Sequence, residues 1–110
     1  MPYGFNEDYT KADMKNIISG THSFTVTAGQ SQDFEIDLMP YMSVIGNVPV
    51  IVATPCYDST VQDYVSGVTV ETYVTSQLGG LAELNGHITV HNNSSTNITS
   101  LTVSYRVIGS

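Results

Sequence analysis

The sequence predicts an all-β domain, an antiparallel sandwich or barrel of six main strands, preceded by a short N-terminal helical arm. Three observations support this fold class. Apolar and polar residues alternate with a period of two from residue 22 onward. Charged residues make up only 12% of the chain, while Thr, Val and Tyr are abundant. Short segments rich in Gly, Asn and Ser separate the apolar runs, with no convincing helix between them. A chain of 110 residues is expected to form one β-domain around a single core.

The first twenty residues are expected to form an arm, residues 1–20, in front of the β-domain at residues 21–110. A capping-box pattern, Thr10 followed by Asp13, indicates the start of a short helix, and Gly20 indicates its end. Helical spacing places three apolar side chains on one stripe, those of Met14, Ile17 and Ile18. So short a helix is unstable alone in water, so the stripe is expected to pack. It either covers the domain's own sheet or docks onto sister subunits or a larger assembly.

The strands between residues 22 and 54 show two patterns. Residues 22–28 and 33–38 alternate cleanly, which predicts half-buried strands separated by a turn at Gly29. The expected inward side chains are those of Phe24, Val26, Ala28, Phe34, Ile36 and Leu38. Residues 48–54 instead form a near-continuous apolar run, which is typical of a strand covered on both faces.

The second half of the chain supplies the remaining strands. Residues 68–75 alternate, and residues 87–91 and 100–108 form a closing pair joined by a polar tip. The connection before residue 68 has room for a short strand around residues 60–64. In the last strand, Arg106 falls on the face opposite the apolar residues Leu101, Val103, Tyr105 and Val107.

The charge balance excludes two classes of partner. Ten carboxylates oppose the cations Lys11, Lys15 and Arg106, for a net charge of −7. Nucleic acids and anionic membranes are bound mainly through lysine and arginine, so neither is an expected partner. No apolar run is long enough for a secretion signal or a membrane span, and no signal peptide is expected.

The sequence indicates no catalytic or metal-binding constellation. His87 and His91 share a strand face, but about 13 Å of extended chain separates them, too far for one zinc ion. An acidic row along one strand is expected to be solvated or to meet a basic partner, because its side chains splay too far apart to converge on calcium. The row consists of Asp33, Glu35 and Asp37. Cys56 has no activating neighbour and is expected to be packed. We therefore expect no enzyme activity, no metal and no cofactor.

Arg106 and the loop tyrosines are the candidates for contact with a partner. As the only arginine, Arg106 is expected to pair with a carboxylate, either within the subunit or across an interface. Ligand contact is the alternative, since a guanidinium matches carboxylates and paired sugar hydroxyls alike. Tyr41, Tyr57 and Tyr64 fall in loops, where a ring can stack on a sugar, anchor an interface or cover the end of a sandwich.

Three motifs resemble those of H-type lectin-like domains: the opening "FTVTAG", the central "PVIVAT" and the closing "VSYRVIG". Such domains occur in invertebrate agglutinins and in tail or fibre proteins of bacteriophages. The leader at residues 1–18 is similar to the N-terminal arms of phage appendage and head-fibre subunits. The resemblance covers residues 22–109 and implies a six-stranded antiparallel sandwich that assembles as a homotrimer.

By this resemblance, the chain is expected to be a surface protein of a bacteriophage virion, made in the host cytoplasm. It would attach to a host-surface glycan or receptor without catalysis. The alternative is a capsid, head-fibre or tail decoration subunit with a purely structural role. The expected ligand-binding residues are Arg106, Tyr57, Tyr64, Asn92 and Asn93. The residues expected to contact sister subunits or other virion proteins are Met14, Ile17, Ile18 and Arg106.

Overall fold

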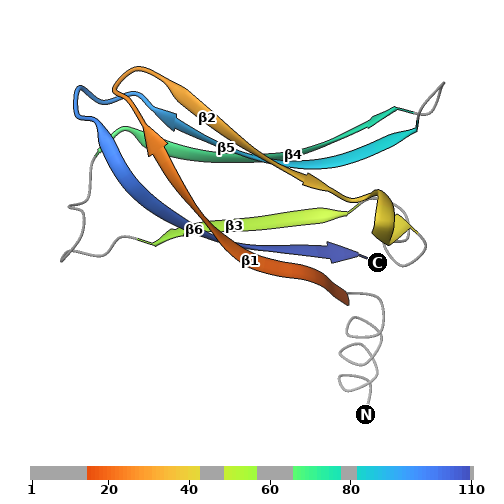
Figure 1. The fold of residues 1–110 in the computed structure, drawn as a ribbon. Coiled ribbons are helices and arrows are strands. Elements are labelled where there is room, and N and C mark those ends of the chain that lie inside the picture. The colour runs from red at the N-terminus through yellow and green to blue at the C-terminus, as the bar shows by residue number, and fades with distance from the viewer. Residues whose placement is uncertain (1–14, 43–48, 57–65, 78–81, 110) are drawn as a thin grey trace, which may run out of the picture.

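The computed structural model describes residues 15–42, 49–56, 66–77 and 82–109. These residues form six strands and one short 3-10 helix, which confirms the all-β prediction. Figure 1 shows two layers, each a three-stranded antiparallel sheet. One sheet has the strand order β1 (Lys15–Val26), β6 (Ile98–Gly109), β3 (Val50–Cys56). The other has the order β2 (Ser31–Asp37), β5 (Glu83–Asn92), β4 (Val68–Gln77), and helix η1 covers Met39–Tyr41. No helix in the described ranges is long and apolar enough to cross a membrane.

The path of the chain makes β5 and β6 the central strands of the two sheets. Most consecutive strands lie in different sheets, whereas β4 and β5 are neighbours within one. Across the layers, β1 contacts β2 and β3 contacts β4. The Thr72 hydroxyl on β4 donates a hydrogen bond of 3.3 Å to the carbonyl of Ile51 on β3. Because β5 has a neighbour on each side, its outward side chains meet those of both β2 and β4.

The inward side chains of both sheets form one apolar core. Phe24 and Val103 are buried within it, and Val70 packs against it. The largest fully buried apolar side chains are Leu38, Ile88, Ile98, Leu101, Val26, Val90, Val103 and Val107. Burial of each such side chain contributes about 1.5–3 kcal/mol. The core confirms that the alternating side chains converge on a shared interior between the sheets.

The helix predicted through residue 20 is wrong for the described part of that segment. Residues 15–20 belong to β1 and pair along β6. Ile17 and Ile18 are half-buried against the core of the same chain, so they pack on their own domain. Pairing with the long strand β6 outweighs the helical pattern, because a short helix gains little stability and isoleucine favours strands. Met14 and the rest of residues 1–14 lie outside the described residues.

The prediction that residues 48–54 are covered on both faces is also wrong. Within the described chain, β3 pairs with β6 alone and lies at the edge of its sheet. Ile51 faces the core, whereas Val50 and Val52 point outward and are 54% and 40% exposed. The apolar run therefore reflects an exposed apolar edge rather than a buried strand. The short strand suggested at residues 60–64 lies outside the described residues.

Candidate functional site

The outer face of the β2–β5–β4 sheet carries two histidines and several carboxylates. Cross-strand register aligns two rows on this face, Asp33–Thr89–Glu71 and Glu35–His87–Tyr73. Because β5 is central, the neighbouring side chains cover it, and His87 is only 9% exposed. The acidic row expected from the sequence is therefore one margin of a polar face whose centre is buried.

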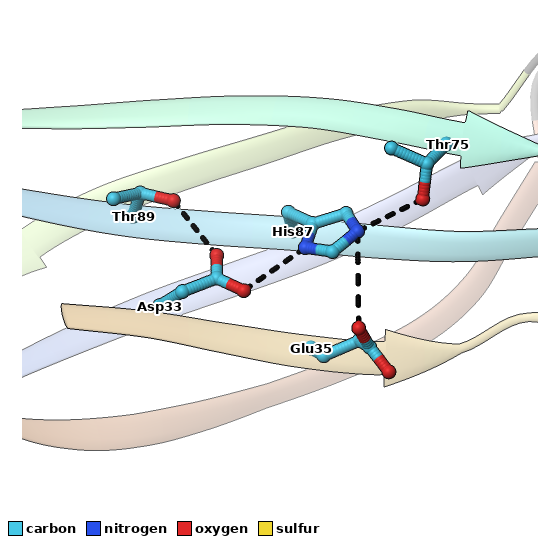
Figure 2. A network of polar contacts seen from close by, with 5 residues as sticks. All are labelled: Asp33, Glu35, Thr75, His87 and Thr89. Atoms are coloured by element: carbon cyan, nitrogen blue, oxygen red, sulfur yellow. Dashed lines mark hydrogen bonds and ion pairs between the residues drawn. The ribbon is translucent and has the colours of Figure 1, made fainter.

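His87 lies at the centre of a polar network that joins all three strands (Figure 2). Its Nδ1 is 3.0 Å from Oδ2 of Asp33 on β2, and its Nε2 is 2.9 Å from Oγ1 of Thr75 on β4. The Thr89 hydroxyl donates a hydrogen bond of 2.7 Å to the other carboxyl oxygen of Asp33. Glu35 approaches from β2, with Oε2 4.0 Å from Nε2 of His87.

The hydrogen-bond partners assign the proton on the neutral His87 ring. An ionised carboxylate only accepts hydrogen bonds, so Nδ1 must carry the hydrogen that it donates to Asp33. Nε2 is then the acceptor and receives the hydroxyl hydrogen of Thr75. The hydrogen bond from Thr89 holds the carboxylate in place. The network is therefore an ordered relay from hydroxyl to imidazole to carboxylate.

Tyr73 covers one side of the His87 ring. The two rings are stacked, with centroids 4.5 Å apart and planes inclined by 6°. Tyr73 itself is 42% exposed. An aromatic ring in this position shields the imidazole from water and presents an aromatic surface to solvent.

His91 forms a second, more open relay near the other end of the face. The Ser31 hydroxyl is 2.7 Å from Nδ1, and Oε1 of Glu71 is 2.9 Å from Nε2. The carboxylate again requires a donor, so Nε2 carries the hydrogen and Nδ1 accepts from Ser31. The His91 side chain is 35% exposed, so water reaches it more easily than it reaches His87.

A pocket of about 320 Å³ opens on the same sheet beside the His87 network. Its lining residues are Glu35, Asp37, Met39, Ala82, Glu83 and Asn85. Asp37 accepts a hydrogen bond of 3.1 Å from the backbone N–H of Met39, which fixes the strand end against η1. Asn85 lies directly opposite Thr75 in the β4–β5 register. The pocket and the network therefore share Glu35 and meet at the Asn85–Thr75 pair.

Metal binding has no support in the described ranges. No group of three or more His, Cys, Asp or Glu side chains there is placed to hold a metal ion. His87 and His91 belong to separate networks, and both carboxyl oxygens of Asp33 are already hydrogen-bonded.

The outer face of the other sheet holds Arg106. Its cross-strand neighbours are Ser19 on β1 and Val52 on β3, and neither carries a charge. Among the described residues, no carboxylate forms an ion pair with Arg106. The expected pairing within the subunit is not found in this part of the chain, and pairing across an interface stays a prediction.

Asn92 is removed from the candidate ligand-binding residues by its burial. It is fully buried, and its amide nitrogen donates to the carbonyls of Val26 and Thr96. Its side-chain oxygen accepts hydrogen bonds from Ser94, so Asn92 organises the turn between β5 and β6. Asn93 is exposed beside it. The two candidate loop tyrosines, Tyr57 and Tyr64, lie outside the described residues.

The expectation that Cys56 is packed is wrong, because Cys56 is exposed at the end of β3. The third histidine, His22, is separate from the other two and lies between the sheets. Its ring stacks on Phe34, with a centroid distance of 3.9 Å. His22 therefore takes no part in the polar face.

Sequence reasoning missed the polar network that joins Asp33, Thr75 and His87. Each residue was visible on the polar side of an alternating strand, but only the strand register brings the three together. Comparison with known proteins adds no relative: no family model, no curated protein and no solved structure matches this chain.

Proposed function

We propose that the chain is a recognition domain on the surface of a bacteriophage virion, which attaches to a glycan on the host surface. The observation that carries the proposal is the pocket lined by Glu35 and Asn85, on the outer face of the β2–β5–β4 sheet that also exposes the ring of Tyr73. The location on a virion and the trimeric assembly are proposed from the resemblance of the sequence motifs to lectin-like domains.

The chemistry of this face suits polyhydroxylated ligands. Carboxylate oxygens of Glu35, Asp37 and Glu83 accept hydrogen bonds from sugar hydroxyls, and the Asn85 amide both donates and accepts. The exposed ring of Tyr73 supplies a flat surface for the C–H face of a sugar. Fixed polar groups around a partly apolar pocket are the usual basis of small-ligand specificity. Three carboxylates at the pocket disfavour acidic sugars, because like charges repel.

One observation favours the alternative, a purely structural decoration subunit. Val50 and Val52 are exposed on the edge strand β3, next to Arg106. Exposed apolar residues on an unpaired strand edge are a common basis of protein–protein contact. A subunit that serves only assembly would use this edge and leave the polar face without a ligand.

An array of bacterial surface polysaccharides separates the two functions. Attachment predicts binding by the wild-type protein and a loss of about tenfold in Tyr73→Ala, the effect expected when a stacking ring is removed. The matched control is Thr21→Ala, an exposed residue on the opposite sheet, which should bind as the wild type does. If the intact wild-type protein bound none of the polysaccharides on the array, this result would overturn the attachment proposal in favour of the structural role.

A further inference from the structure

We propose that the polar face also hydrolyses carboxylic esters, with Thr75 as the nucleophile, His87 as the general base and Asp33 as its positioning residue. The substrate class is an O-acyl ester of a sugar hydroxyl, a choice that rests on the proposed function. The three side chains come from three neighbouring strands and converge on the outer face (Figure 2).

The geometry meets the requirements of a nucleophile–base–carboxylate relay. Thr75 Oγ1 is 2.9 Å from His87 Nε2, and His87 Nδ1 is 3.0 Å from Asp33. Both distances lie within the hydrogen-bond reach that proton transfer requires. The Nδ1–H that donates to Asp33 leaves the Nε2 lone pair directed at the hydroxyl. Thr75 is an exposed residue, whereas the base is buried and fixed.

Asn85 supplies the donor that the reaction needs for the developing oxyanion. It is the direct cross-strand neighbour of Thr75, and directly opposed residues have Cβ atoms about 4.5–5.5 Å apart. Asn85 also lines the pocket, and we assign its amide N–H to the ester carbonyl. A side-chain amide in this role typically contributes about 100- to 1,000-fold to the rate.

The pocket selects the acyl group. It adjoins Thr75 through Asn85, and its volume of about 320 Å³ accommodates a small acyl chain. Glu35, Asp37 and Glu83 line it, so a neutral or cationic acyl group is favoured over an anionic one. An acetyl ester fits these requirements.

The reaction proceeds in two balanced steps. Thr75 Oγ1 attacks the ester carbonyl while His87 Nε2 takes the hydroxyl proton and passes it to the departing sugar oxygen, which leaves an acyl-threonine and a free sugar hydroxyl. His87 then takes a proton from water, whose oxygen attacks the acyl carbon and releases the carboxylic acid and the Thr75 hydroxyl. In each step the imidazolium that forms lies between Asp33 and Glu35, whose negative charges stabilise it.

The Ser31–His91–Glu71 relay serves as an internal comparison. It has the same three chemical groups, but His91 is 35% exposed and none of the three residues lines the pocket. Water competes for a base in that position, and the pocket lined by Glu35 and Asn85 does not include these residues. The structure therefore assigns the activity to Thr75, in contrast to the sequence-based expectation of no catalysis, which stays a prediction until the activity is measured.

The test measures acetate release from p-nitrophenyl acetate and from glucose pentaacetate by five forms of the full chain. These are the wild type, Thr75→Val, Thr75→Ser, His87→Gln and the control Thr69→Val, which changes an exposed threonine on the same strand and face. Thr75→Val and His87→Gln should lower the rate about 100-fold, the usual contribution of such groups. Thr75→Ser and Thr69→Val should keep it. Equal urea midpoints exclude misfolding as the cause.

Two further measurements locate the chemistry. Acid-quenched wild-type protein should carry an acetyl group on the peptide that contains Thr75, and Asp33→Asn should lower kcat with KM unchanged. Equal hydrolysis by the wild type and Thr75→Val, or an adduct confined to another residue, would overturn the inference. Glycan binding without ester hydrolysis overturns this inference alone, whereas hydrolysis of the nitrophenyl ester without glycan binding overturns only the proposed attachment function.

Discussion

The two outer faces of the sandwich have the same arrangement of strands but differ in the length of their side chains. Each is the exposed side of a three-stranded antiparallel sheet whose central strand pairs with a neighbour on both sides. On the β1–β6–β3 face the side chains are mostly short hydroxyls, such as the aligned row Thr21–Ser104–Thr54. On the β2–β5–β4 face, Asp33 and Glu35 reach over the central strand from one side, and Tyr73 from the other. Long flanking side chains are what turn a central strand into an enclosed site.

The same difference explains the contrast between His87 and Arg106, which lie on the outer faces of the two central strands. His87 is buried, held by hydrogen bonds on both ring nitrogens and stacked under an aromatic ring. Arg106 is exposed between Ser19 and Val52, with no ion pair in the described part of the chain. One residue is pre-organised within the domain, and the other is exposed on the opposite sheet.

The largest expected effect is on stability and comes from Asp33→Ala. Removal of the carboxylate leaves the buried N–H of His87 and the buried hydroxyl of Thr89 without their acceptor, which costs about 2–3 kcal/mol. The matched change on the other face, Ser104→Ala, should cost less than about 0.5 kcal/mol. Urea denaturation measures both free energies of unfolding. Similar losses from the two variants would show that the polar network adds nothing to the fold.

A smaller effect is expected from Tyr73→Leu, which keeps apolar bulk on β4 and removes the stacked ring. The loss of stacking on His87 should lower the free energy of unfolding by about 1 kcal/mol. Val52→Ala tests the corresponding exposed position on the other sheet and should change it by less than about 0.5 kcal/mol. Thermal unfolding of the two variants gives the comparison directly. An equal shift in Tm would mean that stacking of Tyr73 on His87 adds nothing to stability.

The smallest effect on folding is expected from Arg106→Gln, within about 0.5 kcal/mol, because the side chain is exposed and even an exposed ion pair contributes little to stability. Its consequence should appear in assembly. Sedimentation of the wild type should give a trimer, and the variant should dissociate at a higher protein concentration. A large loss of stability with an unchanged particle mass would place the arginine's partner inside the subunit instead.

Alternation of side chains was enough to predict the faces of most strands. Phe24, Ile36 and Val103 point inward as their spacing indicates, since one buried face imposes a period of two. The spacing of apolar residues gave a wrong prediction where the same residues fit both a helix and a strand. Ile17 and Ile18 fit a helical stripe, yet pairing with β6 places them in a strand. An apolar run such as residues 50–53 does not reveal whether a strand is central or at an edge.

The candidate site was harder to predict, because it depends on register. Asp33, Thr75 and His87 lie on the polar side of separate strands, and nothing in the sequence aligns them. Burial of Asn92 was equally hidden, since a polar turn residue in a polar segment resembles a surface residue. Hydrogen bonds to the backbone carbonyls of Val26 on β1 and Thr96 in the turn, which the sequence does not specify, determine its role.

The most direct test of the account is an NMR titration of the labelled protein with the polysaccharide that it binds on the array. Amide shifts should move along the outward positions of β2, β5 and β4, around residues 35–37, 71–75 and 83–87, and stay fixed around Val52 and Arg106. Shifts gathered on β3 and β6, with the polar face unchanged, would contradict the central claim that the β2–β5–β4 face carries the function.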